Sequence, residues 1–428
     1  MNTLSGGAST SGLGPNEARR ESSKHASSTI SQQFIRWHLA GSALRASSKL
    51  SASTPWWAAF APAKLLQGGG PPGGDSAGGS GGGGGPQGAV VGPAATKEPV
   101  VLTLASFAVT KLAYVRLTKR FREQYMAEKG IDVRFRLTFA GSGVQARAVI
   151  DGLPAELVAL ALPLDIDRIA HAGLISEQWR GRYPCNSTVC ETTVALVVRA
   201  GNPKNIQDWS DLIRPGVEVV LANPKTAGVA RWIFLALWGA VSRKRGREGG
   251  DARAQEYVER VFDNVVVQPR DAREASDVFY KQRVGDVLLT YENEVVLTNA
   301  VYGDKALPYV VPRDNVRIEC PISLVDKVVE TKAVAVRQAA DDFVKFLFTT
   351  PAQREFAKLG FRVNPKVSKA ASDQQLGLPP AKMWSVDQVF GGWAAAQARF
   401  FDAGKVLDII QEKLGRKRQE NRMVATKK

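Results

Sequence analysis

Apolar and polar positions after residue 97 follow two alternating spacings. Residues 133–139 alternate apolar and polar side chains, which predicts a strand with one buried face. Residues 157–163 form an unbroken apolar run of strand length, as in a parallel sheet that is covered on both sides. After Thr110, by contrast, apolar residues recur near the helical spacing and predict an amphipathic helix.

This strand-loop-helix unit repeats along the chain. We predict further strands at residues 100–105, 193–199, 217–222, 265–268 and 287–291, and helices that follow the 141–143 turn, Asp208, residue 230 and residue 272. Such repeats are typical of an α/β fold with largely parallel sheets. Because about 320 residues are long for one sheet of this kind, we expect two lobes.

The first 96 residues have a different composition. Residues 1–66 are rich in Ser, Ala and Arg without the apolar core of a secretory signal, which is typical of an organelle transit peptide. Residues 68–88 are a Gly/Pro/Ser tract with too little apolar surface to fold. We expect residues 1–96 to be a leader and a flexible linker; a disordered arm of a cytosolic protein is the alternative.

The net charge of +16 lies partly at the two ends of the chain. Residues 1–96 hold seven Lys or Arg and three acids, and residues 411–428 hold seven and two, which leaves about +7 for the body. A moderately basic body fits an anionic ligand, weak nucleic-acid binding or a solvated surface. We interpret the basic tail, residues 413–428, as a solvated helix end, with docking on a partner or on anionic lipid as the alternative.

Residues suited to catalysis or metal binding are scarce. His171 is the only histidine after residue 96, which argues against a Ser/His/Asp triad and a histidine-rich metal site. Cys185, Cys190 and Cys320 form no metal-binding pattern; Cys185 and Cys190 are either free thiols or a local disulfide. The sequence therefore predicts a protein that is not an enzyme and uses neither a cofactor nor a metal.

Four strand-to-helix turns are the expected ligand positions, because helix N-termini meet the carboxyl ends of strands there. They comprise residues 105–108, 140–143, 224–229 and 271–273. These turns offer backbone N–H groups and the Ser142 hydroxyl, whereas the one nearby carboxylate, Asp271, is interpreted as a helix cap. A donor-only pocket suits a fully ionised oxyanion. It predicts weak hydrogen-phosphate binding and an affinity nearly independent of pH from about 5 to 8.

Ordered segments in and between these turns carry a family resemblance. They are FAGSGVQ (139–145), ALAL (159–162), GNPK (201–204), DWSDLI (208–213), NPK (223–225), ARW (230–232), GDVLL (285–289), ENE (292–294), VDKVV (325–329) and VFGGW (389–393). Through them, residues 101–410 resemble the bacterial periplasmic sulfate/thiosulfate-binding proteins.

The resemblance implies a two-lobed, type II periplasmic-binding-protein-like fold, with a mostly parallel, helix-flanked sheet in each lobe. It predicts one lobe at residues 97–190 and 291–355 and the other at 191–290 and 356–412. It also implies that sulfate or thiosulfate is captured between the lobes and delivered to the permease and ATPase subunits of an ABC importer.

The resemblance places the anion at eight positions: Ala108, Ser142, Thr226, Ala227, Gly228, Val229, Ala272 and Tyr291. Three depart from the family pattern. Ala108 replaces an aspartate, Tyr291 replaces a tryptophan, and Ala227 replaces a serine, for which Thr226 is the candidate substitute. The lost serine hydroxyl is worth on the order of 1.5 to 3 kcal/mol towards a charged ligand, which leaves the choice among dianions open.

A transit-like leader on a receptor of bacterial type predicts a sulfate importer of the chloroplast envelope. An anion-responsive regulatory protein that keeps the fold without transport is the alternative function.

Overall fold

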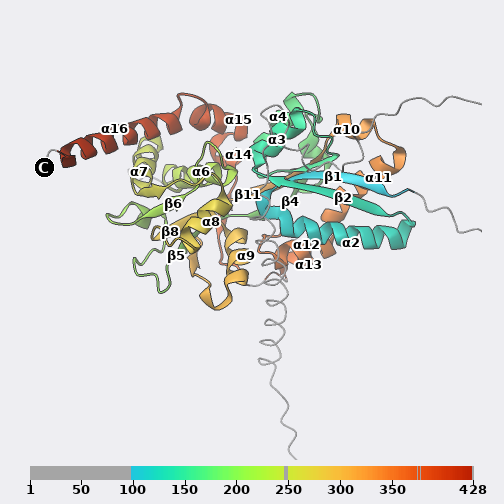
Figure 1. Cartoon of the computed structure of the whole chain (residues 1–428), viewed down its shortest axis with the longest axis horizontal. Helices are drawn as coiled ribbons and strands as arrows, with labels where there is room; N and C mark the ends of the chain where they lie inside the picture. The colour runs from blue at the N-terminus through green and yellow to red at the C-terminus, as the bar shows by residue number, and fades with distance from the viewer. Residues whose placement is uncertain (1–97, 245–248, 374, 376, 427–428) are drawn as a thin grey trace, which may run out of the picture.

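The computed structural model of the protein describes residues 98–244, 249–373, 375 and 377–426. The predicted leader and linker, residues 1–96, lie outside this range. Two five-stranded sheets, each flanked by helices, form two lobes that lie side by side (Figure 1). The predicted two-lobed α/β architecture is confirmed.

The first lobe has the strand order β2-β1-β3-β11-β4. Its strands are β1 (Val100–Phe107), β2 (Val133–Ala140), β3 (Leu157–Ala159), β4 (Thr188–Thr192) and β11 (Ile318–Leu324). β1 runs parallel to β2 and β3, whereas β11 runs antiparallel to β3 and β4. Its helices are α2 (Lys111–Lys129), α3 (Ser142–Ile150), α4 (Pro163–His171), α10 (Asp326–Glu330), α11 (Val334–Leu347), α12 (Thr350–Lys358) and α13 (Lys369–Asp373).

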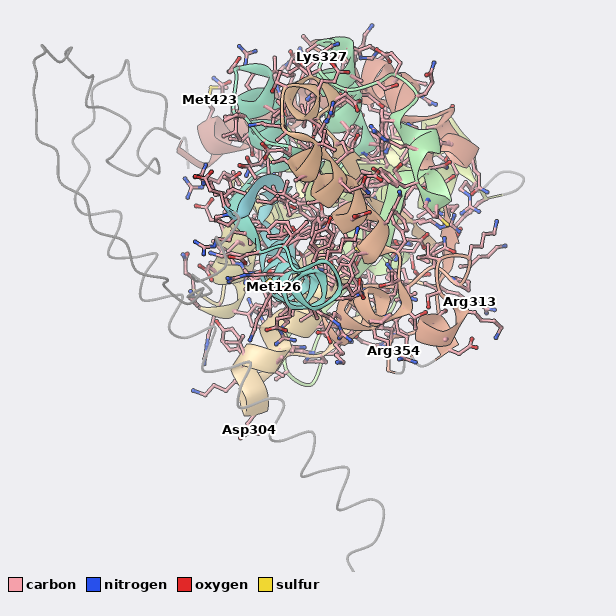
Figure 2. The ribbon with its side chains drawn as sticks, turned by 90° about the vertical axis from the view of Figure 1, so that its right-hand side faces the viewer. Met126, Asp304, Arg313, Lys327, Arg354 and Met423 are labelled. Carbon is pink, nitrogen blue, oxygen red and sulfur yellow. The ribbon has the colours of Figure 1, made fainter. Side chains whose placement is uncertain are left out.

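Both faces of this sheet are covered. On one face Phe121 of α2 packs edge-on against Phe343 of α11, with ring centroids 5.2 Å apart. On the other face, a separate apolar cluster joins α3 and α4 to Ala105 and Val158. Figure 2 views this lobe from its free end, with Met126 of α2 and Lys327 of α10 labelled on its surface.

The second lobe has the strand order β7-β6-β8-β5-β9. Its strands are β5 (Val194–Val198), β6 (Val219–Leu221), β7 (Val265–Val267), β8 (Val287–Tyr291) and β9 (Tyr309–Val310), and its helices are α6 (Gly228–Ser242), α7 (Asp251–Asp263), α8 (Ala272–Tyr280), α9 (Glu292–Tyr302) and α16 (Val406–Thr426). β6, β7 and β8 are parallel, whereas β5 is antiparallel to both of its neighbours. α6 is buried along nearly its whole length, which its almost wholly apolar sequence permits.

The chain passes between the lobes where β4 leads into β5 and where β10 (Asp314–Val316) leads into β11. The two crossings are joined by hydrogen bonds from Thr193 Oγ1 to the Val316 carbonyl (2.8 Å) and from Asn315 Nδ2 to the Val194 carbonyl (2.9 Å). β10 also pairs with β12 (Lys382–Trp384), which leads into α14 (Val386–Phe390) and α15 (Trp393–Ala396). We call the β4–β5 and β10–β11 crossings the hinge.

Shorter elements complete the chain: η3 (Ala108–Thr110), η4 (Trp179–Arg182), η5 (Trp209–Ile213), η7 (Gly303–Lys305), the left-handed turn α5 (Pro184–Ser187) and the π-helical turn η8 (Gln397–Phe401). The helix predicted after Asp208 is therefore only the 3₁₀ turn η5. Cys185, Cys190 and Cys320 are all free thiols, so the local disulfide is absent. Within the described ranges, no helix has the length and apolar character needed to span a bilayer.

The predicted lobe boundaries differ from the strand pairing. Residues 291–310 were expected in the first lobe, but β9 pairs with β5 in the second sheet. Residue 356 was expected to begin the return to the second lobe, but α12 continues to Lys358 and packs on α2. The differences arise because the crossings are set by β4–β5 and β10–β11, whose partners lie far apart in the sequence.

Candidate functional site

Each of the four predicted turns leads directly into a helix at a predicted donor. η3 begins at Ala108, α3 at Ser142, α6 at Gly228 and α8 at Ala272. The N-terminal ends of α3, α6 and α8, where the helix dipole is positive, therefore lie at these turns.

The N-termini of α3 and α6 have no side-chain cap. Their N-cap residues are Gly141 and Ala227, and neither supplies an oxygen acceptor from its side chain. Within the described part of the chain, the N–H groups of Ser142, Gly228 and Val229 have no protein acceptor. An outside acceptor is needed to satisfy them.

Ala161, in the loop between β3 and α4, brings these two helix ends together. Its N–H donates to Ser142 Oγ (3.0 Å), and its carbonyl accepts from the Trp232 indole of α6 (2.9 Å). A Cβ placed on Gly228 would lie 3.5 Å from the Ala161 Cβ, so the lobes are in contact here. The α3 and α6 N-termini thus face one small region between the lobes.

Two further contacts bring the remaining turns to this region. Thr226 Oγ1 donates to the Arg270 carbonyl (2.7 Å), which holds the α6 and α8 N-termini side by side. The rings of Phe107, which precedes Ala108, and Tyr291 have centroids 6.4 Å apart across the lobes. These contacts join the α3, α6 and α8 starts to one another and, separately, Phe107 to Tyr291, so that a shared anion site at the eight positions stays a prediction.

The Tyr291 hydroxyl lacks a protein partner among the described residues. The side chain that carries it is 3 % exposed. Burial, followed by nearby acidic groups that include Asp165, raises the pKa of the Tyr291 phenol well above its usual value. The phenol is therefore a neutral donor at physiological pH.

Ser142 has a carboxylate neighbour that the sequence interpretation missed. Ser142 Oγ donates to Asp165 Oδ2 at 2.6 Å, and Asp165 is 1 % exposed. Burial raises the pKa of Asp165, while the Ser142 hydrogen bond and the charges of Arg168 and Arg231 oppose this. The expectation of a region without an acidic acceptor is therefore wrong.

Asp165 was missed because the end of the strand that precedes it was placed too late. Residues 157–163 were assigned to one strand, but β3 stops at Ala159 and α4 begins at Pro163. The turn between them is a fifth strand-to-helix turn, and Asp165 lies in the first turn of its helix. Asp271 acts as predicted: its Oδ1 caps α8 by accepting from the Glu274 N–H at 2.8 Å.

Two predicted positions already have partners within the protein. The Thr226 hydroxyl is committed to Arg270, so in this arrangement it does not replace the hydroxyl absent at residue 227. The Ala227 N–H donates to the Asn223 carbonyl at 2.9 Å. The unpaired donors are therefore the N–H groups at the helix starts and the Tyr291 hydroxyl.

A cavity of about 710 Å³ opens beside these helix ends. Thr226, Ala227 and Gly228 line it; the other predicted positions do not. Most of its cationic side chains are paired with acids. Arg147 pairs with Asp151 (2.8 Å), and Lys225 pairs with Asp408 (2.8 Å), which is not itself part of the lining. The wall is thus weakly basic, and the described residues contain no group of acids, histidines or cysteines able to hold a metal ion.

Comparison with known proteins identifies the family. Residues 102–362 match the model of the bacterial extracellular solute-binding proteins. The sulfate-binding protein of Synechocystis sp. is 43 % identical over 327 residues, which cover 76 % of this chain and 90 % of that protein. The thiosulfate-binding protein of Pseudomonas aeruginosa is 35 % identical, covering 76 % and 95 %.

The chain belongs to the bacterial extracellular solute-binding protein family. The solved structure of the sulfate-binding protein SubI from Mycobacterium tuberculosis agrees, with 34 % identity and a TM-score of 0.61 over 71 % of this chain and all of that one. These solute-binding relatives confirm the predicted resemblance and the type II fold. Their family also supports the expectation that the chain is a binding protein and not an enzyme.

Proposed function

We propose that this chain is the substrate-binding subunit of an ABC-type importer, which captures a sulfate dianion between its lobes and presents it to membrane permease and ATPase subunits. One observation carries the proposal: the uncapped N-termini of α3 and α6 meet at Ala161, with the start of α8 beside them. The relatives named for sulfate and thiosulfate binding support the same ligand class.

Backbone N–H groups suit sulfate because the ion is fully ionised and has only acceptor oxygens. Each N–H group donates one hydrogen bond to the charge, and the helix dipoles add favourable partial charge without a cationic side chain. The N–H groups of Ser142, Gly228, Val229 and Ala272, the N–H of Ala108 and the Tyr291 hydroxyl would supply these bonds. A dianion held this way can be released when the lobes part, because no salt bridge has to break.

The same donors should disfavour hydrogen phosphate. Its proton needs an acceptor, and Asp165 already accepts from Ser142 and from Arg168 (3.2 Å). A buried proton without a partner costs ~1–3 kcal/mol. Sulfate should therefore bind at least about fivefold more tightly than phosphate.

For location, we propose the chloroplast envelope. The composition of residues 1–96 supports this, as does the similarity to a cyanobacterial sulfate-binding protein. The full chain with a C-terminal fluorescent tag should accumulate at plastids, whereas removal of residues 2–66 should leave it in the cytosol. A cytosolic full-length protein would contradict this location.

Titration calorimetry of the full chain with sulfate, thiosulfate, molybdate and phosphate tests the proposed ligand. Saturable sulfate binding with one site is expected, with phosphate markedly weaker. Equal affinity for phosphate, or no sulfate binding, would contradict the proposal. Co-purification with permease and ATPase subunits separates the importer from the regulatory alternative.

A further inference from the structure

Three carboxylates gather at the hinge. Glu191 on β4 and Glu319 on β11 are directly opposite in the antiparallel ladder. Side chains in such a pair lie on the same face of the sheet, with Cβ atoms about 5 Å apart. Asp387, on α14 after the β10–β12 pair, lies close enough for its charge to act on Glu319.

The Glu191–Glu319 pair lies next to both crossings between the lobes, so a movement of one lobe relative to the other would change its surroundings. Glu191 is one residue from the end of β4, where the chain passes to β5, and Glu319 is the second residue of β11, after the chain returns from β10. The backbone of Glu191 is also bridged to Arg362 in both directions, by N–H to carbonyl bonds of 2.9 and 2.7 Å. A change of charge on Glu319 therefore acts beside the crossings themselves.

The two carboxylates of the ladder differ in their partners. Glu191 accepts from Asn364 Nδ2 (2.8 Å) and lies 3.6 Å from Arg317. Glu319 is partly buried and has no hydrogen-bond partner among the described residues. Arg180, the other cation near it, is paired with Asp167 at 2.9 Å.

This arrangement makes Glu319 the group that titrates. Burial, then the charges of Asp387 and Glu191, raise the pKa of Glu319 to about 7, against the opposing charges of Arg180 and Arg317. A carboxyl with an ordinary environment titrates near 4.3. In the arrangement described here, with the lobes in contact at Gly228 and Ala161, Glu319 is therefore partly protonated at neutral pH, whereas a carboxyl in an ordinary environment is ionised.

We propose that protonation of Glu319 favours the hinge arrangement in which the lobes are in contact, so that anion binding tightens as the pH falls through neutrality. The inference rests on the proposed function, because it concerns the regulation of that same site. A hinge movement that separates Glu319 from Asp387 or admits water returns the carboxyl towards its ordinary acidity. The contacting arrangement then binds more protons than the separated one, and lower pH favours it by linkage.

The proposal replaces the expectation of a flat pH profile. The donors of the cleft do not titrate between about pH 5 and 8, so they alone predict no change. A carboxyl whose pKa is about 7 in one state and ordinary in the other changes the affinity by up to about tenfold between pH 6 and 8. The ligand site thus contributes affinity that does not depend on pH, and the hinge contributes the pH dependence.

Calorimetric sulfate titrations of the full chain at pH 6, 7 and 8 test this. Affinity should fall several-fold from pH 6 to 8, and titrations at pH 7 in two buffers of different ionisation enthalpy should show uptake of a fraction of a proton per sulfate. Glu319→Gln should bind at pH 8 nearly as tightly as at pH 6, without proton uptake. Asp387→Asn should reduce the slope.

The matched control is Glu330→Gln on α10, an exposed acid that pairs with Lys327 at 3.0 Å and should keep the parental slope. A pH-independent affinity in the parent would overturn the inference, and so would a slope that persists in Glu319→Gln. Absence of sulfate binding at every pH would instead overturn the proposed function and the inference with it.

Discussion

Ser142 connects the anion site to the first lobe at the scale of single atoms. Its hydroxyl accepts from Ala161 and donates to Asp165, while its N–H is unpaired at the start of α3. The residue therefore sets the position of the β3–α4 loop and also offers a donor to the ligand. This double role makes it the most informative side chain to change.

Ser142→Ala should weaken sulfate binding about tenfold or more, because it leaves the buried Asp165 carboxylate without its Ser142 donor and the Ala161 N–H without its acceptor, next to the N–H groups offered to the ligand. Calorimetry gives the affinity. Ser323→Ala is a matched control, since Ser323 is also a buried first-lobe serine but bonds the Leu324 carbonyl. An unchanged affinity in Ser142→Ala would remove this hydroxyl from the ligand site.

Tyr291→Phe should lower the affinity for sulfate several-fold while leaving thermal stability nearly unchanged. The reason is that the phenolic O–H has no partner within the described protein, so its loss affects only a ligand. Tyr291→Trp tests the exchange for the indole that the family carries here. Parental affinity in the Phe variant would show that the phenol does not contact the anion.

The sequence identified the backbone donors because small residues after strands mark close approach of the main chain. Gly141, Gly228 and Ala272 could be located in this way. Asp165 could not, because its proximity to Ser142 depends on β3 ending after three residues inside an unbroken apolar run. The commitment of Thr226 to Arg270 likewise depends on two loops that are far apart in the sequence.

α6 links the site to the core at the scale of elements. Its uncapped N-terminus faces the ligand region, whereas its far end packs against β10 and the Trp384 side chain of β12. Most of its residues are buried, and α7, β10 and the strands β5 and β8 pack against it. Its position therefore depends on close packing at Gly239.

Gly239→Ala should destabilise the protein by ~1–3 kcal/mol, because the new Cβ would lie 2.3 Å from the Trp384 ring. The free energy of urea unfolding measures this. Gly415→Ala on α16 is the control: no atom lies within 4 Å of its Cβ, so the change should stabilise by up to ~1 kcal/mol. Equal stability of both variants would mean that Trp384 does not pack there.

The spacing of apolar residues predicted most strands of both sheets but not all their directions. β8 was located to the residue, and β1 and β2 to within two residues at their ends. The antiparallel direction of two strands was missed, namely that of β5 beside β8 and that of β11 beside β3. These directions follow from the crossings between the lobes and not from the local spacing of apolar residues. The tail beyond residue 413 continues α16, where Lys413 pairs with Glu259 and Lys417 with Asp263, both at 2.6 Å.

At the scale of the whole molecule, the hinge holds the two lobes in register. Arg362 donates to both oxygens of Glu292 (2.6 and 2.8 Å), and the Glu292 side chain is fully buried at the start of α9. The pair joins the first-lobe segment beside β4 to the second lobe. Its loss should therefore affect both folding and the relative position of the lobes.

Arg362→Met should lower the free energy of unfolding by ~3–5 kcal/mol, because it leaves Glu292 buried without its partner. Lys281→Met, which breaks an exposed pair with Asp277 at 2.8 Å, should cost less than ~0.5 kcal/mol. Chemical denaturation compares the two. A similar small loss in both would show that Glu292 finds another partner or water.

The location of the bound anion tests the central claim most directly. Selenate has the charge and shape of sulfate, and its selenium gives an anomalous signal in a crystal of the full chain. We predict one peak between the N-termini of α3, α6 and α8, within hydrogen-bonding distance of the Ser142, Gly228, Val229 and Ala272 N–H groups. A peak among the arginines that line the cavity, or no peak at saturating selenate, would contradict the account.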